Sequence, residues 1–191
     1  MKNHDQSPSN RSTVVWLSVA VGLAVAARLL PHPPNFTPLA ALGLFAGAVS
    51  LRPKLAGFAI LAAMLVSDMF LGFHPLMPVI YGCLLANIAI GTFFVRGGRG
   101  SRFSFNLKST GRIFAGSLMG SVLFFVVTNF AHFLAFYPMT SSGLMSCYTA
   151  AIPFFQYTIT GDLVYSGVLF GAFALSMTGS RTAVASFETA R

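Results

Sequence analysis

Long apolar runs separated by short polar connections dominate the chain. A helix needs about 17–25 mostly apolar residues to cross the hydrocarbon core of a bilayer. Six helices are predicted, over residues 13–30, 38–51, 54–71, 77–95, 113–136 and 158–178. The run 38–51 has only 14 residues, a length that also suits a re-entrant or interfacial piece, and we interpret it as a short helix.

The connection before the last helix has a mixed character. Residues 142–157 mix apolar and polar positions and contain Pro153. This pattern predicts an amphipathic segment on the outer membrane surface. Residues 13–178 then form a single membrane domain between two cytoplasmic tails, 1–12 and 179–191.

Composition excludes the common soluble classes. The chain has 191 residues, of which 55% are hydrophobic and 8% charged, whereas a soluble domain carries about 25% charged residues. A soluble enzyme, a disordered tail, a disulfide-rich module and a collagen-like repeat are therefore excluded. The expected fold is an all-α integral membrane protein whose first partner is the lipid bilayer.

The net charge of +8 follows the predicted topology. If six helices span the membrane with both termini inside, eleven of the 12 Lys and Arg residues fall on the cytoplasmic side. These residues are Lys2, Arg11, Arg52, Lys54, Arg96, Arg99, Arg102, Lys108, Arg112, Arg181 and Arg191. Arg28 is the exception. Topology thus explains the positive charge, and no nucleic-acid partner is expected.

Most unusual polar residues fall in the outer half of this topology, and an ionisable group inside a span is a functional-site hypothesis by default. They include Arg28, His32, Asp68, His74, Tyr81, Cys83, Asn129, His132, Tyr148 and Asp162. The pattern predicts a pocket open to the outside, between the helices 77–95, 113–136 and 158–178, with residues 31–38 as a lid. Arg28 is expected to pair with Asp68, Asp162 or both, which leaves one carboxylate for a ligand or for protonation.

Structural interpretations of the same residues stay open. The two aspartates can balance Arg28 in an ion network, and Asn129 can join helices by hydrogen bonds. The histidines can be wet loop residues. A lone cysteine in an apolar helix is often a packing residue, and this interpretation is favoured for both Cys83 and Cys147.

Several segments carry a resemblance to a known family. They are RLLPHPPNFTP at 28–38, SDMFLGFH at 67–74, CYTAAIPFF at 147–155, and shorter matches at 128–130, 137–138 and 161–162. They resemble a family of small bacterial membrane proteins, itself similar to the substrate-binding S components of energy-coupling-factor vitamin transporters. The resemblance implies an S-component-like bundle in the bacterial inner membrane. It also implies that Ala20 and Ala24 dock an energy-coupling ATPase module.

Within that class the chain looks like the solitary cobalamin transporters. The resemblance implies that Cys83 ligates the cobalt of a corrin, with His32, Asp68 and Tyr81 nearby. A thiolate is a soft ligand that suits a transition metal. The chain departs from the pattern beside the outer segment, where Gln156 stands in place of a basic residue, which puts that contact in doubt.

The expected function is vitamin uptake, with cobalamin as the leading ligand and no intrinsic cofactor or catalytic residue. The predicted binding residues are His32, Asp68, Tyr81, Cys83, Asn87, Asn129, Tyr148 and Asp162. S-component-like transport of another vitamin or metal is an alternative. An intramembrane enzyme would need a nucleophile–base pair, for which Cys83 and a histidine are the only candidates, and chemistry on a bound corrin stays open. A structural or assembly protein would instead pair its outer polar residues with one another and leave no cavity.

Overall fold

The part of the chain that the structure describes is built from helices. The computed structural model describes residues 10–31, 33–50, 52–98 and 100–189, with the side chains of 14–177 in these ranges. The helices are α1 (Asn10–Leu29), α2 (Leu39–Val49), α3 (Pro53–Leu71), α4 (Met77–Ile90), the π-helical turn η1 (Gly91–Val95), α5 (Leu107–Phe136) and α6 (Ser141–Thr189). The predicted all-α class with six helices is confirmed. His32, Arg99 and the tail residues 1–9 and 190–191 lie outside the described residues.

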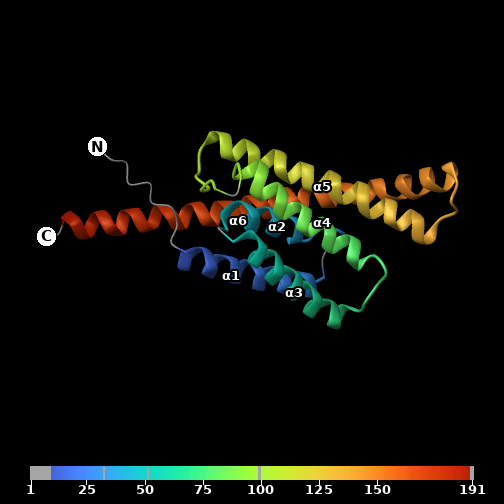
Figure 1. The fold of residues 1–191 in the computed structure, drawn as a ribbon, viewed down its shortest axis with the longest axis horizontal. Helices are drawn as coiled ribbons and strands as arrows, with labels where there is room; N and C mark the ends of the chain where they lie inside the picture. The colour runs from blue at the N-terminus through green and yellow to red at the C-terminus, as the bar shows by residue number, and fades with distance from the viewer. Residues whose placement is uncertain (1–9, 32, 51, 99, 190–191) are drawn as a thin grey trace.

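The short helix α2 forms the centre of the molecule. Nine of its 11 residues are buried, and it contacts each of the other α-helices, which are arranged around it along one long axis (Figure 1). Its residues join two apolar clusters, one with α1, α3 and α4 and one with α6. The core is therefore built around a helix of Ala, Gly, Leu, Phe and Val.

Four helical segments are long and apolar enough to cross a membrane. They are Pro53–Leu71, Met77–Val95, Leu107–Phe136 and Ser141–Met177. α2 is about 16 Å long at about 1.5 Å per residue, roughly half of the hydrocarbon thickness. The protein is thus membrane-embedded, with α2 enclosed by the other helices.

The segment 142–157 differs from its prediction. It does not form a separate surface helix, because α6 runs without a break through Pro153. Two of its polar side chains bond within the protein: Gln156 donates to the Pro153 carbonyl at 3.0 Å, and Tyr148 donates to the Val126 carbonyl of α5 at 2.7 Å. These two side chains therefore need no aqueous surface.

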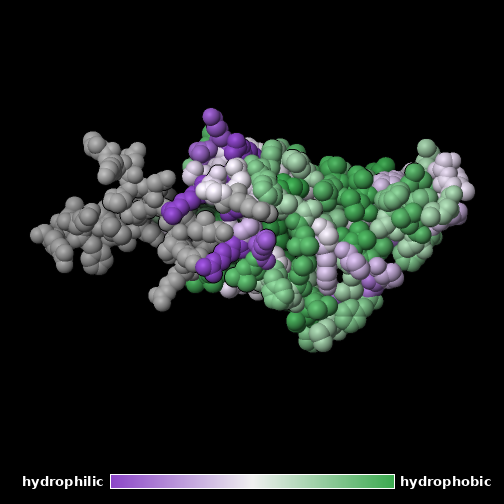
Figure 2. Space-filling model, viewed as in Figure 1, coloured by the Kyte–Doolittle hydropathy of each residue, from purple (hydrophilic) through white to green (hydrophobic). Residues whose placement is uncertain are grey.

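The two ends of the bundle differ in charge. The connections α2–α3 and η1–α5, together with the first turns of α3 and α5, hold the exposed side chains of Arg52, Lys54, Arg102, Lys108 and Arg112. They lie at the end where α1 begins, and Figure 2 shows the strongest purple there. The connections α1–α2, α3–α4 and α5–α6 lie towards the other end, without a described Lys or Arg.

Candidate functional site

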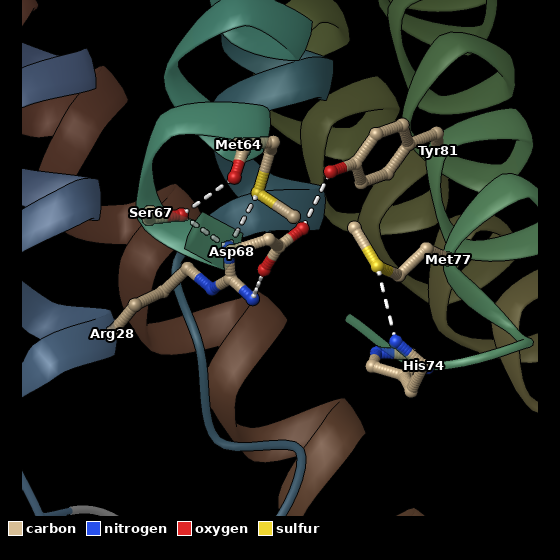
Figure 3. Close-up of polar contacts among 7 residues, drawn as sticks. All are labelled: Arg28, Met64, Ser67, Asp68, His74, Met77 and Tyr81. Atoms are coloured by element: carbon tan, nitrogen blue, oxygen red, sulfur yellow. Dashed lines mark hydrogen bonds and ion pairs between the residues drawn. The ribbon is translucent and has the colours of Figure 1, made fainter. Parts of the chain in front are cut away.

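A charge network joins the helices α1, α3 and α4 (Figure 3). Nη2 of Arg28, in the last turn of α1, donates to Oδ1 of Asp68 on α3 at 2.6 Å. Nη1 of the same guanidinium donates to the Ser67 hydroxyl at 2.5 Å and lies 3.3 Å from the sulfur of Met64. Tyr81 of α4 donates its hydroxyl to Asp68 Oδ2 at 2.5 Å. The predicted pairing of Arg28 with Asp68 is confirmed.

The second aspartate stands apart from this network. Asp162, on α6, is only 4% exposed. Its Oδ2 accepts a hydrogen bond from the Ser121 hydroxyl of α5 at 2.6 Å. Among the described residues, Asp162 has no cationic partner within ion-pair distance, and none donates to its Oδ1. It is the spare carboxylate that the charge count of one cation and two anions predicted.

Two cavities open beside these groups. The cavity that we call the Asp162 cavity has a volume of about 340 Å³. Its polar lining comes from Arg28, Asn35, Thr37, Thr158 and Asp162. Its remaining wall is apolar and is contributed by α2, α3, α4 and α5.

The second cavity, which we call the His132 cavity, has a volume of about 380 Å³ and lies between α4, α5 and α6. Its polar lining consists of Asn35, Thr128, Asn129, His132, Tyr137, Cys147 and Thr158. The two cavities share four wall residues, Asn35, Ile80, Phe124 and Thr158. The two cavities therefore adjoin, with these four residues in the wall that they have in common.

Asn35 has an unusual backbone. Its φ is +64°, in the left-handed region that asparagine tolerates better than most residues. The turn around it is closed by hydrogen bonds from Phe36 N to Pro33 O at 3.1 Å and from Thr37 N to Asn35 O at 3.0 Å. Phe36 packs against Tyr165 of α6, with ring centroids 5.4 Å apart. The turn thus places Asn35 at the junction of both cavities.

Some predicted site residues reach the cavities and others do not. Asn129 lines the His132 cavity, and Asp162 lines the Asp162 cavity. Asp68 and Tyr81 line neither cavity. Asp68 binds Arg28, which lines the Asp162 cavity, and Tyr81 binds Asp68. The phenol oxygen of Tyr148 donates to a backbone carbonyl of α5. His32 lies outside the described residues.

Cys83 and Asn87 occupy the packed interface of α4. Both are buried, at 2% and 1% exposure, and neither lines a cavity. Asn87 donates to the Cys83 carbonyl at 3.0 Å. A side chain at Gly120 would place its Cβ 2.1 Å from Asn87 Oδ1, so the amide fills the space that this glycine leaves on α5.

Cys147 was missed by the sequence reasoning as a cavity residue. Its thiol lies 3.4 Å from the Asn129 carbonyl, and both cysteines are free thiols. The sequence did hold one indication of the His132 cavity. It is the polar stripe of α5, which continues from Ser121 through Thr128 and Asn129 to His132. Within the described residues, no three His, Cys, Asp or Glu side chains lie close enough to hold a metal ion.

The fold and site define a small helical membrane protein with a two-compartment hollow away from its basic end. The chain belongs to the family of unknown function DUF6580, whose model matches residues 8–185. No curated protein and no solved structure matches it.

Proposed function

We propose that the protein is a multi-pass protein of the bacterial inner membrane that binds a vitamin-sized small molecule for uptake. The single observation that carries this proposal is the hollow formed by two adjoining cavities of about 380 and 340 Å³. Small-molecule sites commonly measure about 300–1,000 Å³ and have apolar walls with a few placed polar groups. The Asp162 cavity has such a mostly apolar wall, and the His132 cavity has apolar and polar lining residues in equal numbers. A purely structural protein has no need of such a hollow.

The orientation follows from charge. Cytoplasmic loops of membrane proteins are enriched in Lys and Arg, which places the connections α2–α3 and η1–α5 inside. The α5–α6 connection, next to the His132 cavity, then lies outside. In this arrangement six helices cross or enter the membrane, both termini are cytoplasmic, and the hollow receives its ligand from the outer side.

The turn at 33–37 is the gate in this proposal. Asn35 lines both compartments, while Phe36 rests on Gly161 and Tyr165 of α6. A Cβ at Gly161 would lie 3.3 Å from the Phe36 Cα, so the glycine permits this close contact. Prolines on both sides of the turn limit the conformational freedom that is lost when it closes.

Cobalamin remains a prediction of the family resemblance. Because Cys83 lines neither cavity, a cobalt–sulfur bond requires α4 to shift or turn. A corrin is also larger than either compartment, so both must join and open to admit it. If cobalamin is the ligand, mixing it with the protein changes the visible absorption of the corrin, and this change is lost in Cys83→Ala and retained in Cys147→Ala.

The ATPase partner also remains a prediction, but its expected contact residues lie inside the molecule. Ala20 and Ala24 are 3% and 2% exposed and belong to the apolar cluster with Leu42 and Ile60. Docking through these two alanines requires α1 to separate from α2 and α3. A coupling module that leaves α1 in place must use another surface.

The test places a bulky side chain in the His132 cavity and measures the binding of vitamins. Cobalamin, thiamine, riboflavin, nicotinamide and biotin are added separately to purified protein, and the unfolding temperature is recorded. Ala151→Phe places a ring in the His132 cavity, whereas the control Ala135→Phe alters an exposed position of α5 that lines neither cavity.

At least one vitamin should raise the unfolding temperature of the unchanged protein and of Ala135→Phe, and the shift should shrink in Ala151→Phe. An absence of any shift with the unchanged protein contradicts the proposal. An equal shift in both variants contradicts it as well.

A further inference from the structure

We infer that the Asp162 cavity selects a ligand group that presents N–H donors, either an ammonium or a primary amide, and rejects carboxylates. This inference rests on the proposed function and names the chemical class that the hollow recognises. The observation behind it is a difference between two aspartates: in the part of the chain that the structure describes, Asp68 is paired with a cation, whereas Asp162 is not.

Arg28 is the only described cation that lines this cavity, and Asp68 neutralises it. The carboxylate of Asp68 lies 2.6 Å from the guanidinium and also accepts from Tyr81. Nη1 of Arg28 is in addition engaged with Ser67 and Met64. A ligand carboxylate would have to compete with Asp68, which is buried and held by two donors.

Asp162, unlike Asp68, has no cationic partner among the described residues. It lines the cavity, is 4% exposed, and receives a single hydrogen bond, at Oδ2. Its Oδ1 accepts none within the described residues. A buried carboxylate without a cation is costly, since buried charges in proteins are normally paired. A ligand N–H group supplies the missing donor.

Other elements around Asp162 do not supply it. The α5 face presents the Ser117 and Ser121 hydroxyls, and Ser117 donates to Ser166 rather than to the carboxylate. Thr158, one turn before Asp162 on α6, donates to the Phe154 carbonyl. α2 presents Leu39 and Ala40, which have no polar side chain. Among the described residues, the cavity therefore presents one carboxyl group without a cationic partner on a mostly apolar wall.

Two chemical sources can deliver the N–H group, and matched probe pairs distinguish them. Pyridoxamine and 4-pyridoxic acid share a ring and differ in bearing an ammonium or a carboxylate. Nicotinamide and nicotinic acid differ in bearing a primary amide or a carboxylate. Binding of all four to the purified protein is measured by calorimetry, together with the vitamins of the panel above.

In at least one pair, the N–H member should bind about 10-fold or more tightly than its acid, because hydrogen bonds to a charged group are the stronger ones. Asp162→Asn keeps the shape and the acceptor for Ser121 but removes the charge, and it should abolish this preference. The loss should be larger for the ammonium than for the amide. The control Ala135→Phe, which lines neither cavity, should retain the preference.

The preference in the unchanged protein needs no variant, so the inference stays testable if Asp162→Asn does not fold. Equal or tighter binding of the acids overturns it, and so does an unaltered preference in Asp162→Asn. Binding of a panel vitamin without binding of either N–H member also overturns it while the proposed function stands. An absence of binding by every compound overturns both.

Discussion

Asp68 holds together the ends of three helices. Its carboxylate binds Arg28 of α1 and Tyr81 of α4, while the residue itself belongs to α3. Its exposure is 2%, so the carboxylate has little access to water. A charge buried in this way is stabilised only while its partner remains in place.

We expect Asp68→Asn to destabilise the protein strongly, because it leaves the partly buried Arg28 guanidinium without a counter-charge. The loss should be about 3–5 kcal/mol, the range for breaking one side of a buried pair. Ser67→Ala removes a hydrogen-bond acceptor of the same guanidinium but no charge, and should cost about 0.6–2 kcal/mol. Unfolding in mixed detergent measures both, and equal losses would contradict the ion-pair interpretation.

Individual residues were predictable where charge decides their partners. One cation and two anions in apolar spans require a pair and a spare carboxylate, and this is the arrangement of Arg28, Asp68 and Asp162. The cysteines were not predictable in this way. Lipid makes the outer face of a membrane helix as apolar as its inner face, so hydrophobic periodicity did not reveal that Cys147 lines a cavity and that Cys83 is buried away from both cavities.

Helix α2 packs against α4 and its continuation η1 with the backbones almost in contact. A Cβ on Gly91 would lie 2.1 Å from the Leu44 carbonyl oxygen, and one on Gly47 would lie 2.1 Å from the Ile88 carbonyl oxygen. Thr92 of η1 donates to the Gly47 carbonyl of α2 at 3.1 Å, which links these two elements. Small residues allow such close approach in membrane helix pairs.

Arg96 fixes the end of the same helix pair. It is 5% exposed, and its guanidinium donates to the Ser50 carbonyl at the end of α2 and to the Gly98 carbonyl. A cation at a helix C-terminus compensates the negative end of the helix dipole. Burial lowers the pKa of the Arg96 guanidinium.

Gly91→Ala should be among the most damaging small substitutions in the chain. Its methyl group would meet backbone atoms of α2, which cannot rotate away, and we expect a loss of about 3 kcal/mol. Gly82→Ala is the matched control, because a Cβ there has no neighbour within 4 Å. It should be neutral or stabilise by up to about 1 kcal/mol. Similar unfolding midpoints for the two variants would show that α2 and α4 do not pack as described.

Helix ends were predictable where local chemistry sets them. Pro53 begins α3 and Gly72, with φ +94°, follows its last residue. α5 begins six residues earlier than predicted, because the side chains of Asn106 and Ser109 form a capping box that the hydrophobic pattern does not register. The start of α6 at Ser141 was also missed. Polar side chains such as Tyr148 and Gln156 bond to helix carbonyls there, which the hydrophobic pattern does not register either.

The whole molecule presents a basic end and a hollow towards the other end, and this polarity makes a prediction about topology. Reporter fusions after residues 34, 74 and 140 should report an external location, and a fusion after residue 104 a cytoplasmic one. The reason is that the described loop cations all lie at the end that contains residue 104. A cytoplasmic location of residue 34 or 74 would contradict the proposed orientation. The hollow would then not be open to the outside.

Uptake of the vitamin that binds, measured in cells, tests the central claim most directly. Cells that depend on this protein for the labelled vitamin should accumulate it with the unchanged chain and with Ala135→Phe. Accumulation should fall to background with Ala151→Phe, because the added ring occupies the His132 cavity. Equal accumulation in all three strains, with the proteins present at equal amounts in the membrane, would contradict the account.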